Sequence, residues 1–84
     1  MKVLAIIVLY NPDINRLIQN IEAVSTQVDE VVLVDNGSNN IDTIVDKIKI
    51  PVKYIFNKNN VGIAKALNEA CEYAVSNNFL YTLQ

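Results

Sequence analysis

The stretch VLAIIVLY at Val3–Tyr10 is continuously apolar and rich in β-branched residues, and EVVLV at Glu30–Val34 repeats this pattern. A strand with one solvated face alternates apolar and polar residues, so unbroken apolar runs predict strands that are covered on both faces. Two shorter runs, VKYIF at Val52–Phe56 and FLYTL at Phe79–Leu83, are predicted as the third and fourth strands. We therefore expect a sheet whose centre is buried between layers of helices.

Between these four runs, apolar residues recur with the period of amphipathic helices. The order β-α-β-α-β-α-β predicts an α/β fold with a parallel sheet, and we treat residues 1–84 as a single domain. Right-handed crossovers favour the strand order 3-2-1-4, which is half of a doubly wound, Rossmann-like sheet. The apolar helical positions are Ile14, Leu17, Ile18, Ile21 and Val24, then Ile41, Ile44, Val45 and Ile48, then Ile63, Ala66, Leu67, Ala70 and Ala74.

Composition excludes several classes of protein. Apolar residues make up 51% of the 84 residues, which argues against disorder, and a net charge of −2 argues against a general nucleic-acid binder. The chain has no histidine, so it cannot use histidine as a catalytic base or zinc ligand. Its one cysteine, Cys71, is predicted to lie in the core. No apolar run is long enough to span a membrane, and Val3–Tyr10 lacks a secretory cleavage site, so we expect a cytoplasmic protein.

Three polar loops follow the first three strands: Tyr10–Asp13, Asp35–Asn40 and Asn57–Asn60. In open parallel sheets, ligands bind outside the carboxyl ends of the strands, near the point where the strand order reverses. Asparagine recurs in all three loops, and its tolerance of left-handed backbone and its capping of helices explain much of this. The three loops are predicted to lie together on one edge of the sheet, which favours a binding site there.

The first two loops supply four candidate residues. Tyr10 stands at the mouth of the first strand, where it either lies flat under a nucleobase or packs in the core. Asn11 is predicted to cap the first helix, with Pro12 as its first residue. Asp35 ends a buried strand, where a bare carboxylate is costly without donors, and it either binds ligand hydroxyls or caps its own loop. Gly37 suits a tight turn with positive φ.

The third loop leads into a helix with small residues on one side. Asn60 is predicted as its N-cap, and Gly62, Ala66 and Ala70 allow close approach to the sheet or to a ligand. Lys65 is either a solvated surface lysine or a cation beside an anion at the helix N-terminus. Neither G-x-G-x-x-G nor G-x-x-x-x-G-K-[ST] occurs, which argues against classical dinucleotide binding and against P-loop chemistry.

Four blocks in this order resemble the start of a family 2 glycosyltransferase with the GT-A fold. They are VLYNPD at Val8–Asp13, VVLVDNGSNN at Val31–Asn40, NKNNVGIAKALNEA at Asn57–Ala70, and the hydrophobic strand Phe79–Leu83. Together they span nearly the whole chain. The NPD and GIAKALN segments are similar to a rhamnosyltransferase-like branch of the family.

Three blocks in order with the right spacing are a specific signal, and the third block can be compared with the family pattern residue by residue. It fits the family pattern N-x-G-x-x-x-A-x-N-x-G through Asn60, Gly62, Ala66 and Asn68. Ala70 departs from the pattern, because glycine is usual at that place.

Family members transfer a sugar from a nucleotide-diphospho-sugar to an acceptor hydroxyl, usually with Mg²⁺ or Mn²⁺, here by implication in polysaccharide biosynthesis. The resemblance implies that Tyr10 and Asn11 border the nucleobase and that Asp35, in the loop with Gly37, bonds the base or ribose. It also implies that Asn60, Gly62 and Lys65 lie near the nucleoside and diphosphate. The predicted nucleotide-sugar-binding residues are therefore Tyr10, Asn11, Asp35, Gly37, Asn60, Gly62 and Lys65.

The resemblance also implies that the chain is the N-terminal part of a longer domain, because it stops at Gln84, where the family's metal-binding D-x-D-type motif should follow. Catalytic residues are then expected beyond Gln84. For this chain alone we expect no transferase activity, weak donor binding, no tight metal binding, and a homo-oligomer through an exposed sheet edge.

Two other classes are weighed against this one. In the first alternative, the chain is a self-associating α/β module that binds no nucleotide, and Asp35→Ala then changes only its stability. A receiver-like signalling domain would need an acidic cluster and an aspartate at the end of the third strand, where Asn57 stands.

Overall fold

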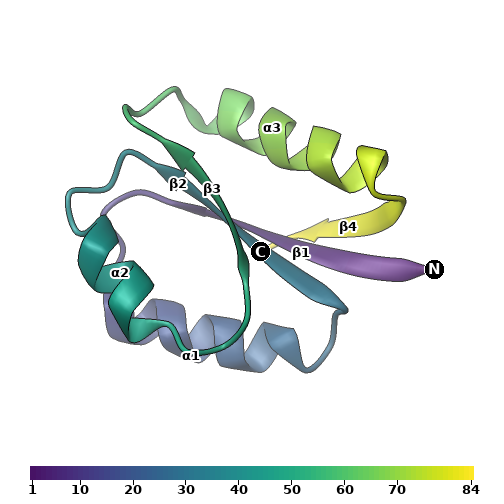
Figure 1. Ribbon diagram of the computed structural model, residues 1–84, viewed down its shortest axis with the longest axis horizontal. Coiled ribbons are helices and arrows are strands. Elements are labelled where there is room, and N and C mark those ends of the chain that lie inside the picture. The colour runs from purple at the N-terminus through teal and green to yellow at the C-terminus, as the bar shows by residue number, and fades with distance from the viewer.

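Strands β1 (Lys2–Leu9) and β2 (Glu30–Asn36) form the centre of the sheet in a computed structural model that describes residues 1–84. β3 (Lys53–Asn57) pairs with β2 and β4 (Phe79–Leu83) pairs with β1, so the order is β3-β2-β1-β4 and every pair is parallel. This confirms the α/β class and the predicted order 3-2-1-4. β1 and β2 are buried because each has a strand on both sides and helices on both faces (Figure 1).

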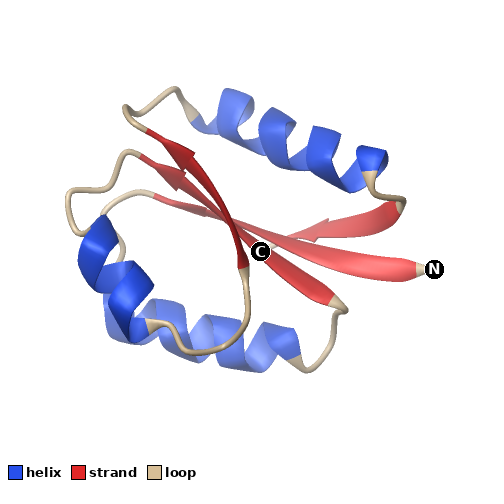
Figure 2. Ribbon diagram, in the orientation of Figure 1, coloured by secondary structure: helices blue, strands red, loops and turns tan.

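Helices cover the two faces of the sheet unequally. α1 (Ile14–Ser25) and α2 (Ile41–Lys47) lie on one face, and α3 (Ile63–Ser76) lies alone on the other (Figure 1, Figure 2). Because successive side chains of a strand point to opposite faces, β2 supplies Leu33 to the first layer and Val32 and Val34 to the second. The apolar core therefore consists of two clusters with the sheet between them.

The helices match their predicted apolar faces except at Val45 of α2, which is 43% exposed, and at one end of α3. Leu17 and Ile21 of α1 are buried against the sheet. On α3 the buried line consists of alanines, whose small side chains let the helix lie close to β1 and β2. Ile63 was predicted in this line but is 67% exposed and lies outside the α3-side core cluster. The alanines are Ala66, Ala70 and Ala74.

Three local predictions need correction. Cys71 is only partly buried and lies beside the α3-side core instead of within it. Asn11 does not cap α1; the Asp13 side chain does, by accepting from the Arg16 amide at 3.1 Å. Asn60 does not cap α3, whose N-cap residue is Gly62. Both asparagines are instead engaged in bonds between or within loops, which keeps their side chains from the helix ends.

The longest helix, α3, has 14 residues, and none of the three helices combines the length and the apolarity needed to cross a bilayer.

Candidate functional site

The three polar loops meet at the carboxyl edge of the sheet, as predicted, and we call residues 10–13, 35–40 and 57–62 the rim (Figure 2). Asp35 is central to it. In the sheet register Asp35 stands beside Leu9 of β1 and beside Phe56 of β3. The rim is therefore built on the ends of three adjacent strands, with β2 in the middle.

The two oxygens of the Asp35 carboxylate have different surroundings. Its side chain is 2% exposed, and Oδ2 accepts hydrogen bonds from the amides of Gly37 at 3.2 Å and Ser38 at 3.1 Å. These bonds confirm the loop-capping alternative for that oxygen. Oδ1 is buried and has no hydrogen-bond partner. A buried polar atom without a partner is costly, so the loop alone does not account for this carboxylate.

Gly37 is held in a conformation that only glycine adopts easily. Its φ is +87°, which confirms the predicted tight turn. A Cβ built on Gly37 would lie 2.9 Å from the carbonyl carbon of Asn59, so the turn packs directly on the backbone of the third loop. Gly62 also has a φ of +87°, but a Cβ there would meet nothing within 4 Å.

Loop one is tied to loop two by a pair of short hydrogen bonds. The Asn11 amide donates to Ser38 Oγ at 2.8 Å, and the Asn39 amide donates to Asn11 Oδ1 at 2.7 Å. Asn11 has a φ of 45°, so it uses the left-handed backbone that asparagine tolerates. The side chain of Asn40 adds a longer bond, from Nδ2 to the carbonyl oxygen of Pro12 at 3.3 Å.

Loop two is tied to loop three by Asn36, which is 1% exposed. Its Nδ2 donates to Asn60 Oδ1 at 3.0 Å, and its Oδ1 accepts from the Val61 amide at 3.0 Å. Asn60 Oδ1 also accepts from the Gly62 amide at 2.8 Å. The rim is thus a single hydrogen-bonded unit.

The remaining predicted residues are open to solvent. Tyr10 is 54% exposed, so the alternative that it packs in the core is wrong. Lys65 is exposed on the first turns of α3. Phe56, predicted only as part of the third strand, is 58% exposed beside Asp35 and stacks on Tyr54, with ring centroids 5.2 Å apart. Burial raises the pKa of Tyr54 above its usual value.

Asn36 and Ser38 were not among the predicted site residues. A sequence signal for Asn36 exists: it is the second of two consecutive polar residues that end an otherwise apolar strand, DN after EVVLV. Both are buried, and a buried polar side chain in that place needs partners from a neighbouring loop. Nothing in the pattern identifies Ser38 Oγ as the acceptor for the backbone of Asn11.

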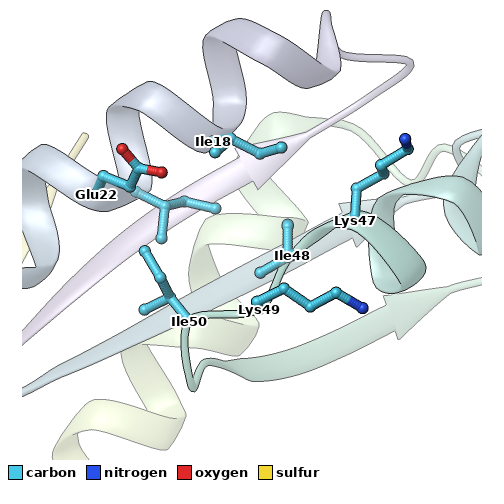
Figure 3. Close-up of a pocket in the computed structure, with 7 residues that line it drawn as sticks. Ile18, Glu22, Lys47, Ile48, Lys49 and Ile50 are labelled. Atoms are coloured by element: carbon cyan, nitrogen blue, oxygen red, sulfur yellow. The ribbon is translucent and has the colours of Figure 1, made fainter.

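The rim is an open edge, since none of the four hollows in the surface is lined by a predicted site residue. One hollow, of about 120 Å³, lies between α1 and the connection from α2 to β3, with Ile18, Ile48 and Ile50 around it and charged side chains at its margin (Figure 3). This connection enters β3 at its amino end, so the hollow is remote from the rim.

The chain does not by itself fit a divalent metal. Mg²⁺ and Mn²⁺ prefer several oxygen ligands, and no group of three histidine, cysteine, aspartate or glutamate side chains gathers anywhere in the structure. At the rim, two buried oxygens lack a hydrogen-bond partner, Asp35 Oδ1 and Asn40 Oδ1, which is fewer than such an ion needs.

The fold is an open, parallel α/β sheet whose polar loops gather at the carboxyl ends of its strands, the edge at which sheets of this kind bind ligands. The family model for glycosyl transferase family 2 matches residues 4–83. The chain therefore belongs to glycosyl transferase family 2. Searches among curated proteins and among solved structures give no significant match.

Proposed function

We propose that the rim binds the nucleotide part of a nucleotide-diphospho-sugar, the donor for glycosyl transfer to an acceptor hydroxyl. The observation that carries this proposal is the buried Oδ1 of Asp35, which has no donor in the free chain. A ribose hydroxyl or a base N–H is a donor of the right kind, and its bond to a carboxylate would be charge-assisted. Because Oδ1 is shielded from solvent, such a donor reaches it only when a neighbouring rim side chain moves aside.

The other rim residues supply a surface for the rest of the nucleotide. The exposed ring of Tyr10 is available to stack on a base, and Asn11 holds the loop that carries it. Asn60, Gly62 and Lys65 lie where β3 leads into α3, which offers a helix N-terminus and a cation to the phosphates. Each of these exposed groups makes only a weak interaction with the nucleotide, so we expect a Kd of about 1 mM, which corresponds to a binding free energy near −4 kcal/mol.

Transfer of the sugar requires more than this chain offers. A metal would neutralise the departing diphosphate, and the residues here do not fit one. We therefore expect no turnover of nucleotide sugars by this chain alone and propose that transfer needs Mg²⁺ or Mn²⁺ held by ligands other than the residues described here. A rhamnosyl or other hexosyl donor, polysaccharide as the product, and a cytoplasmic location remain predictions.

The test is an amide NMR titration of the chain with UDP, dTDP and GDP, each with and without Mg²⁺. Saturable shifts at Tyr10, Asn11, Asp35 and Gly37 support the proposal, and the preferred base assigns the donor class. Asp35→Asn is the informative variant. Its oxygen can still accept from the amides that Oδ2 now binds, while its NH₂ group replaces the free acceptor with a donor. We expect it to fold and to lose the nucleotide shifts.

Asp46→Asn is the matched control, because it removes the same charge from an exposed position on α2. Equal loss of binding in both variants would mean that overall charge, and not the Asp35 oxygen, governs affinity. Absence of shifts with all three nucleotides would overturn the proposal for this chain.

One observation favours a second candidate, a module that associates with itself. β4 is an edge strand with a free backbone edge, and three of its five side chains are large, apolar and about half exposed. An edge of this kind is a template for pairing with the same edge of a second copy. Sedimentation at several concentrations tests it, and a monomer throughout would rule it out. The side chains are Leu80, Tyr81 and Leu83.

A further inference from the structure

We infer that Asn36 is a positioning residue, which fixes the segment Asn59–Gly62 and, through it, the turn that holds Asp35. This inference rests on the proposed function for its meaning, because it names the side chain that keeps the nucleotide edge assembled. The geometry of Asn36 itself can be tested in the free chain.

The argument starts from the pleat of β2. Asp35 and Asn36 are consecutive strand residues, so their side chains point to opposite faces of the sheet. Asp35 follows Leu33 on the face that α1 and α2 cover, and Asn36 follows Val34 on the face that α3 covers. Asn36 is therefore the last residue of β2 whose side chain points toward the α3 side, where the third loop enters its helix.

At that place Asn36 satisfies both ends of its amide. It donates to Asn60 Oδ1 and accepts from the Val61 amide, each at 3.0 Å. Asn60 Oδ1 accepts twice, because it also receives the Gly62 amide. The two asparagines are therefore not equivalent: position 36 must donate and accept, whereas position 60 only accepts.

These bonds hold the third loop against Gly37. The backbone of Asn59 lies so close to Gly37 that a Cβ there would stand 2.9 Å from it. Gly37 belongs to the turn whose amide binds Asp35 Oδ2. If the Asn36 bonds are removed, the third loop is free to leave Gly37, and the turn beside Asp35 loses its support.

The experiment compares four variants with the wild type by amide hydrogen exchange and chemical shift, without ligand. In Asn36→Ala we expect the Val61 amide to exchange about tenfold faster or more, and the shifts of Gly37 and Gly62 to move. Asn59→Ala is the control, because the Asn59 side chain makes no hydrogen bond in the structure. It should leave all three amides unchanged.

The third and fourth variants test the asymmetry between the two asparagines. Asn60→Asp preserves an acceptor for both donors, so protection of Val61 should persist. Asn36→Asp keeps the acceptor for the Val61 amide but replaces the donor to Asn60 Oδ1 with a second oxygen, and the repulsion between the two oxygens should push the loops apart and lower that protection. A general loss of packing would not separate these two isosteric changes. Equal effects at positions 36 and 60, or an unchanged Val61 amide in Asn36→Ala, would overturn the inference.

Titration with the nucleotide that the wild type prefers adds the functional readout. We expect binding to weaken at least fivefold in Asn36→Ala and to be unchanged in Asn20→Ala, which removes an exposed asparagine of α1 outside the rim. Unchanged affinity in Asn36→Ala, with its loop loosened, would remove the link to binding. A wild type that binds no nucleotide would overturn the proposed function, while the exchange data would still decide the role of Asn36 in the loop.

Discussion

Gly37 and Asn59 are packed so closely that a Cβ on the glycine would lie 2.9 Å from the carbonyl carbon of the asparagine. Contact at this distance is shorter than real side-chain contacts allow, and the obstacle is backbone, which cannot rotate away as a side chain would. Gly37 also has a φ of +87°, so two independent effects exclude other residues. The second loop is thereby fitted to the third.

Gly37→Ala should therefore destabilise the chain more than Gly62→Ala. Both glycines have a φ of +87°, and backbone strain of this kind costs roughly 1–3 kcal/mol. The Cβ at Gly62 meets nothing within 4 Å, whereas the one at Gly37 adds a collision worth roughly 1–3 kcal/mol. Urea unfolding of the two variants measures the difference. Equal losses would show that strain alone acts at both glycines.

Tyr73→Phe should lower the free energy of unfolding by about 1 kcal/mol at neutral pH. The Tyr73 hydroxyl of α3 donates to Glu30 Oε1 of β2 at 2.6 Å, and this bond is the main cause that raises the pKa of Tyr73 above 10.0. Phenylalanine keeps the ring, which stacks on Phe79 with the ring centroids 6.2 Å apart. Urea unfolding at pH 7 gives the size of the effect.

The pH dependence of this bond has a definite sign. Because the folded pKa of Tyr73 lies above the unfolded value, its contribution is complete below about pH 10 and is lost as the pH rises through the folded value. The wild type and Tyr73→Phe should therefore converge in stability above pH 10. The raised pKa of Tyr54 affects both proteins alike and cancels in the difference. A gap that stays constant up to pH 11 would contradict this prediction.

The fold was predictable because its signals are local and repeated. Unbroken apolar runs marked β1 and β2 as buried strands, and the alternation of strands and helices fixed a parallel sheet whose handedness leaves few orders. The limits of β2 were less predictable. It extends through Asp35 and Asn36, two polar residues whose place in a strand depends on partners from other loops.

The site was predictable in its location and less so in its bonds. Parallel strands bring their following loops to one edge, so Tyr10 and Asp35 were assigned to that edge from sequence order alone. The partner of a particular asparagine was not predictable, because capping its own helix and bonding a distant loop require the same residue type. Asn11 and Asn60 both make the second kind of contact, which was wrongly predicted as the first.

Tyr10→Ala should weaken nucleotide binding while leaving stability nearly unchanged. The ring is 54% exposed, so its removal should change the free energy of unfolding by less than about 0.5 kcal/mol. Stacking of a base on an aromatic ring is worth roughly 1–3 kcal/mol, or about fivefold to 150-fold in Kd. Tyr10→Phe should bind as the wild type does, because it retains the ring. NMR titration measures all three, and equal binding by the alanine variant would exclude stacking.

Leu80→Lys should abolish self-association if copies of the chain pair through β4. Leu80 is 57% exposed on the edge strand, beside Val3 of β1 in the register. A lysine there keeps the strand but places a charge that an apolar interface cannot bury without a partner. Val75→Lys is the matched control, since Val75 is 69% exposed but lies on α3. Sedimentation should show a monomer for the first variant and the wild-type assembly for the second. If both variants associate as the wild type does, the contact lies away from β4.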